Sequence, residues 1–206
     1  ADVRVEDLTE SHMCLALQGP RAPELLARIT SADLQGVKPF REFALDFDAR
    51  RAGVAVEAKG WGPGDDDPLM GAASGTEPTP ASGGLRFFAT RTGYTGEPGF
   101  ELFPSTEVGP AVWNALLAAG AGLPIRPVGL GARDTLRLEK GYLLSGQDFT
   151  GSQTPLEVSS AWVVKWDHAF VGRAALEGQR ARDGYRRLVG VRMLDRGIPR
   201  HACAVS

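Results

Sequence analysis

The stretch of residues 91–101 reads RTGYTGEPGFE. Three glycines and one proline among these eleven residues predict a constrained turn whose backbone a ligand can approach closely. Apolar segments on either side, Leu85–Ala89 and Phe100–Phe103, predict two strands that this turn connects. The segment therefore predicts a strand, a turn and a second strand.

The turn also carries side chains that can bind a ligand. Tyr94 offers a flat ring and a phenol, while Glu97 and Glu101 offer carboxylates. Because Glu101 begins the predicted second strand, we expect its carboxylate to be held more firmly than that of Glu97, which lies in the turn and is expected to be solvated. From these residues alone, a hairpin with solvated acids fits equally well.

A second stretch, residues 129–142, reads GLGARDTLRLEKGY. It predicts a helix from about Leu130 to Lys140 that ends at Gly141. Arg133 and Arg137 are one turn apart on the same side of this helix, and arginine can make paired hydrogen bonds to a carboxylate or a heterocycle. A surface helix with ordinary ion pairs is the alternative interpretation. The glycines are not a dinucleotide-binding fingerprint, since the third glycine and the preceding strand are missing.

The other segments mix strands and helices without a regular βαβ repeat, which predicts an α+β fold. Further strands are expected at Met13–Leu17, Phe40–Phe47, Ala161–Trp166 and Leu188–Met193. Further helices are expected from Pro20 or Pro23 to Ile29, at Val108–Ala119 with a cap at Ser105 or Thr106 and an end at Gly120, and at Ala174–Arg182.

The composition excludes several classes of protein. The 206 residues carry 23 Lys and Arg against 25 Asp and Glu, a net charge of −2, so no field attracts nucleic acid or an anionic membrane. No apolar run reaches the roughly 18 residues that a membrane span needs. The two cysteines and three histidines lack metal-ligand spacing, so no metal site is expected. The chain also lacks a phosphate-binding GxxxxGK[ST] loop and a GxSxG nucleophile elbow.

The least regular stretch is residues 60–84, GWGPGDDDPLMGAASGTEPTPASGG. Its glycines and prolines leave no apolar period, so it cannot bury enough surface to offset the ordering of its backbone. We expect a long, mobile surface loop there.

Seven motifs, in their order along the chain, resemble those of the T-protein family of the glycine cleavage system. The members of that family are tetrahydrofolate-dependent aminomethyltransferases. The resemblance covers nearly the whole chain outside the loop. The motifs are ALQGPRAPELL (16–26), RTGYTGEPGFE (91–101), GLGARDTLRLEKGY (129–142), TPLE (154–157), WVVKWD (162–167), FVGRAAL (170–176) and RGIPRH (196–201).

The resemblance implies a reaction, a cofactor and a partner. The lipoyl arm of an H-protein presents an aminomethyl group, and the one-carbon unit moves to tetrahydrofolate with release of ammonia. The resemblance places Glu101 and Arg133 in the folate site and Tyr94 and Tyr142 among the aromatic residues around it. It also implies a cytoplasmic protein, or one of the mitochondrial matrix if the source is eukaryotic.

The chain departs from the family pattern at both ends. The family's essential aspartate lies before the part that matches Ala1, so no catalytic residue is assigned here, and the family's last domain continues beyond RGIPRH. We therefore expect a central fragment, inactive by itself, with a folate-binding core over residues 1–185 and the start of a truncated C-terminal β domain over 186–206. Ser159 and Ser160 replace a glycine-rich step that is common after TPLE in the family.

Three alternatives stay open at this point. The LRLEKGY motif also occurs in the folate domain of dimethylglycine and sarcosine dehydrogenases, although no flavin-binding glycine motif is present. The folate-binding protein of iron–sulfur cluster assembly has a KGC[FY]xGQE motif, which residues 140–148 match only loosely and without the cysteine. An inactive scaffold that only docks a partner is the third.

Overall fold

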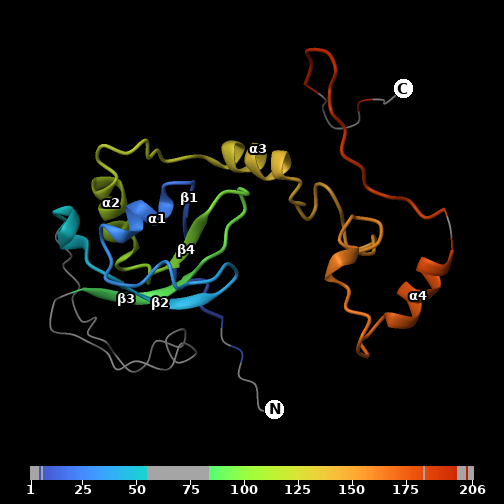
Figure 1. Ribbon diagram of the computed structural model, residues 1–206, viewed down its shortest axis with the longest axis horizontal. Coiled ribbons are helices and arrows are strands. Elements are labelled where there is room, and N and C mark those ends of the chain that lie inside the picture. The colour runs from blue at the N-terminus through green and yellow to red at the C-terminus, as the bar shows by residue number, and fades with distance from the viewer. Residues whose placement is uncertain (1–4, 6, 55–83, 183, 199–202, 204–206) are drawn as a thin grey trace. The chain divides into compact units, whose positions relative to one another are not determined.

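The computed structural model of the chain describes residues 5, 7–54, 84–182, 184–198 and 203 (Figure 1). Apart from Gly84, the predicted loop at 60–84 lies outside the described residues. The chain divides into two compact units, Ala1–Lys140 and Gly141–Ser206, and each is described by itself.

The first unit is built on a four-stranded antiparallel sheet. Its strands lie in the order β1-β4-β3-β2 and span Leu15–Gln18 (β1), Glu42–Phe47 (β2), Leu85–Thr90 (β3) and Gly99–Phe103 (β4). Together with the helices, this sheet confirms the predicted α+β class. Three strands differ in their starts: β1 begins two residues after Met13, β2 begins after the exposed Phe40, and β4 begins two residues before Glu101. Glu101 is therefore the middle residue of its strand.

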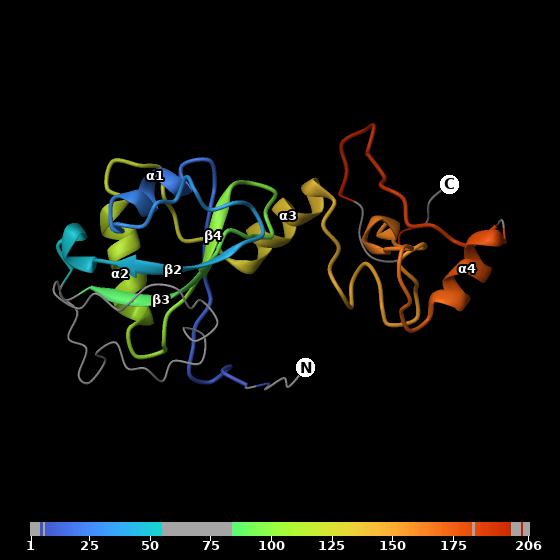
Figure 2. The same cartoon turned by 60° about the horizontal axis from the view of Figure 1, so that its bottom comes forward.

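One face of the sheet forms the core with two helices, α1 (Ala22–Ala27) and α2 (Gly109–Ala119), which Figure 2 shows from a second side. A short 3-10 helix, η1 (Ala49–Ala52), also contacts α2. Alternate strand residues point into this core because successive side chains of a strand face opposite sides. Its fully buried members include Leu26, Ile29, Leu45, Phe47, Phe87, Phe100, Leu102 and Val112.

The helices of this unit follow the predicted positions, with one wrong cap. Pro23 lies in the first turn of α1, where the missing N–H leaves no bond unmade. Gly120 ends α2 as predicted. The predicted cap at Ser105 or Thr106 is wrong: Val108 is the N-cap of α2 and no side chain caps it, since the Ser105 carbonyl already binds the amides of Val108 and Gly109.

Helix α3 spans Leu130–Lys140, the bounds predicted from the sequence (Figure 1). Gly141 follows it with φ +80°, a conformation that glycine adopts without the penalty of a Cβ atom.

The second unit has little regular structure. Helix α4 (Arg173–Ala181) confirms the helix predicted from 174 to 182, and Gly172 precedes it with φ +90°. The strand predicted at 161–166 is wrong, because Ala161–Val163 forms a 3-10 helix, η3. The strand predicted at 188–193 is also wrong: these residues are exposed and pair with no strand of the described chain. Strands need a partner strand to satisfy their backbone groups, and the described part of this unit offers none.

Among the described residues, no helix is long and apolar enough to cross a membrane.

Candidate functional site

Glu101 lies at the middle of β4, on the sheet face opposite the core. Its neighbours in sequence, Phe100 and Leu102, are buried in the core, while Glu101 is half-buried. On the adjacent strands it pairs with Ala16 and Thr90. Strand β4 pairs on both sides, which fixes the backbone at Glu101.

A chain of hydroxyl groups holds the Glu101 carboxylate. The Thr92 hydroxyl donates to Oε2 of Glu101, and the hydroxyls of Thr90 and Thr92 lie 2.5 Å apart. With Oε2 engaged, Oε1 keeps its lone pairs for a ligand, since an ionised carboxylate accepts at both oxygens.

Helix α3 packs against the turn of residues 91–101. The guanidinium carbon of Arg133 lies 4.4 Å from the centre of the Tyr94 ring, a cation–π contact. At the far end of the helix, the side chain of Lys140 lies against Gly96, where an added Cβ would come within 2.5 Å of it. The helix thus touches the turn through residues seven positions apart, which share one face.

Arg137 lies between these two contacts on the same face of α3. Its side chain is fully buried, and its Nε donates to Oδ1 of Asp134 at 2.7 Å. Asp134 therefore forms an ion pair with Arg137, one helical turn further on.

The charges of Glu101 and Arg133 both affect the pKa of the Cys14 thiol, one residue before β1. Partial burial raises the pKa of the Cys14 thiol, the charge of Glu101 raises it further, and the charge of Arg133 opposes both. The Thr92–Glu101 hydrogen bond and the Arg133–Tyr94 contact place three of the four predicted site residues, Tyr94, Glu101 and Arg133, on the turn of residues 91–101 or against it.

The fourth residue, Tyr142, belongs to the second compact unit, where it is half-buried. Its place in the site stays a prediction. Glu97 is exposed in the turn, as expected.

Two residues that the sequence did not single out also contact this site. Thr92 holds Glu101, and Gln18 hydrogen bonds to the turn at both ends. Gln18 lies in the ALQGPRAPELL motif, as the one polar residue between an apolar strand and a glycine, and that pattern was the only available indication.

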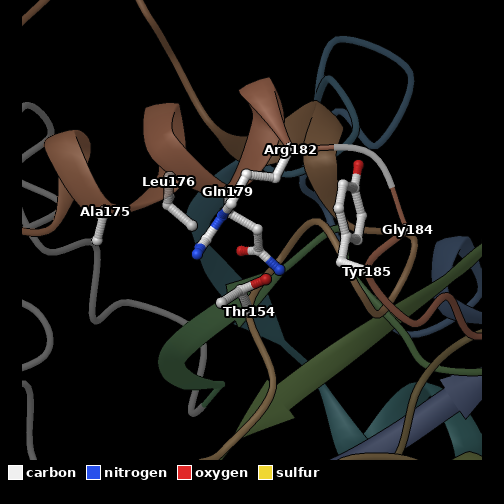
Figure 3. Close-up of a pocket in the computed structure, with 7 residues that line it drawn as sticks. All are labelled: Thr154, Ala175, Leu176, Gln179, Arg182, Gly184 and Tyr185. Atoms are coloured by element: carbon white, nitrogen blue, oxygen red, sulfur yellow. The ribbon is translucent and has the colours of Figure 1, made fainter.

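A separate cavity of about 480 Å³ lies in the second unit, beside α4 (Figure 3). It is lined by Thr154, Ala175, Leu176, Gln179, Arg182, Gly184 and Tyr185. Next to it, the Thr154 amide donates to Oε2 of Glu157 at 2.9 Å, which lowers the pKa of that carboxyl. None of the predicted site residues lines this cavity.

No group of three or more potential metal ligands occurs in the part of the chain that the structure describes.

Comparisons with known proteins show which proteins this chain is similar to. Residues 77–168 match the model of the GCVT N-terminal domain, and this range contains all four predicted site residues. The chain is 39% identical over 206 residues to an aminomethyltransferase of Geobacillus kaustophilus and 37% identical over 206 residues to one of Clostridium botulinum. A probable aminomethyltransferase of Haloarcula marismortui is 38% identical over 208 residues.

These alignments cover 99% to 100% of this chain but only 46% to 47% of each relative, so the chain spans about half the length of the curated relatives it matches. Among solved structures, the glycine cleavage system aminomethyltransferase T from Bartonella henselae is 25% identical, with a TM-score of 0.43 over 83% of this chain and 62% of that chain. Residues 77–168 match the GCVT N-terminal domain model, and the whole chain is similar in sequence to aminomethyltransferases.

Proposed function

We propose that this chain is the folate-binding part of an aminomethyltransferase of the glycine cleavage system. In this reaction the one-carbon unit passes from the aminomethyl-lipoyl arm of an H-protein to tetrahydrofolate, and ammonia is released. The observation that carries the proposal is the Glu101 carboxylate, held on a central strand beside Arg133 and Tyr94, within a chain related to aminomethyltransferases over its whole length.

The chemistry of Glu101 suits a pterin. The pterin ring presents an N–H and an amino group side by side, and a carboxylate can accept a charge-assisted hydrogen bond from each. Thr92 fixes the rotation of the carboxylate, so Oε1 is oriented before a ligand arrives. Glu101 thereby fits the role of pterin acceptor.

Arg133 and Tyr94 supply a planar cation on an aromatic ring. A guanidinium offers paired donors to an oxygen-rich group, which in tetrahydrofolate is the pterin carbonyl or the glutamyl carboxylate. The Tyr94 ring restrains the arginine, so fewer of its rotamers are lost when it binds. We assign Arg133 to an oxygen of folate and Tyr94 to the support of that arginine.

The remaining parts of the proposal rest on the relatives. Tyr142 completes the aromatic surroundings of folate, the lipoylated H-protein is the partner, and the cytoplasm, or the mitochondrial matrix in a eukaryote, is the compartment. A folate-binding core over residues 1–185, followed by the start of a C-terminal domain over 186–206, is the domain arrangement we propose, although residues 188–193 form no strand and the compact units divide after Lys140.

Calorimetric titration of the chain with tetrahydrofolate under anaerobic conditions tests the proposal. We expect saturable binding that Glu101→Ala weakens, while adenosine, a heterocycle without the folate tail, gives no heat. Equal titration curves for the unaltered chain and Glu101→Ala would contradict the assigned site. Ammonia release on addition of aminomethyl-lipoyl H-protein tests the transfer itself in the full-length protein, since the chain by itself is expected to be inactive.

A further inference from the structure

Gln18, the last residue of β1, forms hydrogen bonds to both ends of the turn that carries the candidate site. Its side-chain nitrogen donates to the Thr92 carbonyl at 3.2 Å and to the Phe100 carbonyl at 3.1 Å. Its side-chain oxygen accepts from the Thr95 hydroxyl at 3.4 Å. One amide therefore binds the start, the middle and the end of the turn, through both of its N–H groups and its oxygen.

Two glycines of the turn make this approach possible. A Cβ added at Gly93 would overlap the Gln18 side-chain oxygen, and one added at Gly99 would lie 2.5 Å from it. The adjacent backbone is tied as well, because the Gly19 amide donates to the Pro98 carbonyl at 2.9 Å. The glycines of RTGYTGEPGFE thus leave space for the glutamine of ALQGPRAPELL.

The residues that hydrogen bond to Gln18 neighbour the candidate site residues Tyr94 and Glu101 in the sequence. Thr92, whose carbonyl accepts from Gln18, donates its hydroxyl to Glu101. Phe100, whose carbonyl also accepts from Gln18, precedes Glu101 directly. Tyr94, which lies under Arg133, is between Thr92 and Thr95 in the sequence.

We propose that Gln18 is a positioning residue, which sets the Glu101 carboxylate and the Tyr94 ring in one geometry by fixing the turn between them. Its expected effect on a ligand rests on the proposed function, but its effect on the turn does not. A carboxylate of the same shape cannot replace it, because it has no proton to donate and would repel the two carbonyl oxygens.

The test uses the full chain labelled with 3-fluorotyrosine, which gives one fluorine resonance for each of its three tyrosines. The resonance of Tyr94 is assigned by its loss in Tyr94→Phe. We expect Gln18→Glu to move the Tyr94 resonance and to leave those of Tyr142 and Tyr185 in place. Acidification should move it back, because protonation of the introduced carboxyl restores one donor next to the carbonyls.

Two control variants separate positioning from other effects. Gln35→Glu makes the same change of charge at an exposed glutamine, and Val112→Ala weakens the buried core in α2. Neither should move the Tyr94 resonance. If Gln18→Glu fails to fold, Thr95→Val removes a single bond to Gln18 and should give a smaller shift in the same direction.

Tetrahydrofolate titration of the same variants keeps the two proposals distinguishable. We expect Gln18→Glu to weaken binding about tenfold and Gln35→Glu to leave it unchanged. A shifted Tyr94 resonance in a chain that binds no folate would support the role of Gln18 and overturn the proposed function. An unmoved Tyr94 resonance in folded Gln18→Glu would overturn the role of Gln18, whatever the chain binds.

Discussion

Glu97 and Glu101 differ in burial and in how firmly their carboxylates are held. Glu97 is exposed and solvated, while Glu101 is half-buried, lies on a central strand and accepts a hydrogen bond from Thr92. Ordering costs free energy, and for Glu101 the fold supplies the ordering before a ligand binds. Position within the strand therefore distinguishes the candidate binding carboxylate, Glu101, from the exposed Glu97.

Replacement of these two glutamates should have unequal effects on folate affinity. Glu101→Ala leaves the pterin N–H groups without an acceptor, so we expect tetrahydrofolate affinity to fall roughly 5- to 150-fold, or about 1–3 kcal/mol. The affinity of Glu101→Gln should lie between those of the unaltered chain and Glu101→Ala, because the amide oxygen can still accept a hydrogen bond but the amide nitrogen cannot. Glu97→Ala is the control and should change the affinity little. Calorimetry gives all three values, and a larger loss for Glu97→Ala would refute the assignment.

Arginine at position 133 should not be replaceable by lysine. A lysine keeps the charge but loses the planar fork of donors and the stacked contact with Tyr94, so we expect Arg133→Lys to weaken folate binding nearly as much as Arg133→Ala. Arg126→Lys makes the same change at an exposed arginine before α3 and should have no effect. Full affinity in Arg133→Lys, measured by the same titration, would mean that only the charge matters.

At the scale of elements, the turn of residues 91–101 and helix α3 form one contact surface. Arg133 and Lys140 touch the turn at Tyr94 and Gly96, and the buried Arg137 lies between them on the same face. A basic helix face therefore lies beside a turn with acidic residues at its end. Because α3 contacts the turn at both of these residues, a substitution that moves α3 should also change the geometry of the turn.

Gly96 provides a test of that contact. Its φ is +78°, and an added Cβ would come within 2.5 Å of the Lys140 side chain. Gly53 has a similar φ of +72° but nothing within 4 Å of the corresponding position. We expect Gly53→Ala to lower the free energy of unfolding by about 1 kcal/mol through backbone strain alone, and Gly96→Ala to lower it further.

Urea unfolding gives the free energy of unfolding of Gly53→Ala and of Gly96→Ala. Adding Lys140→Ala to Gly96→Ala removes the two Lys140 atoms at 2.5 Å and should recover most of the excess loss, while the Cβ atom at 3.0 Å stays in tight contact. An equal loss in Gly96→Ala and Gly53→Ala would mean that the lysine moves aside freely.

The elements differ in how far the sequence predicts them, for physical reasons. Helix α3 has the predicted bounds because Gly129 and Gly141 mark its ends locally. The segments at 161–166 and 188–193 have the apolar character of strands, but a strand also needs a partner, which its own sequence does not specify. The contacts of Gln18 join residues 74 to 82 positions apart, so no local pattern predicts them.

At the scale of the whole molecule, the two compact units differ in what they bury. The main core cluster draws all its buried residues from the first unit, between Leu17 and Leu116. In the described part of the second unit, only Leu156 and Val158 are buried hydrophobic residues, while large apolar side chains such as Trp162, Val189 and Leu194 are exposed. Since burial of apolar surface is the main favourable term in folding, stability should be concentrated in the first unit.

Separate expression of residues 1–140 and 141–206 tests this division. We expect residues 1–140 to unfold cooperatively in urea, and Phe100→Ala, which empties a fully buried ring position, to lower their free energy of unfolding by about 3–5 kcal/mol. Residues 141–206 should show no cooperative transition, because a chain of this length with so small a core does not offset its conformational entropy. Near-ultraviolet circular dichroism should likewise lack the sharp band of a packed ring from Trp162, which is exposed. A cooperative transition in residues 141–206 alone would show that the second unit contains a core of its own.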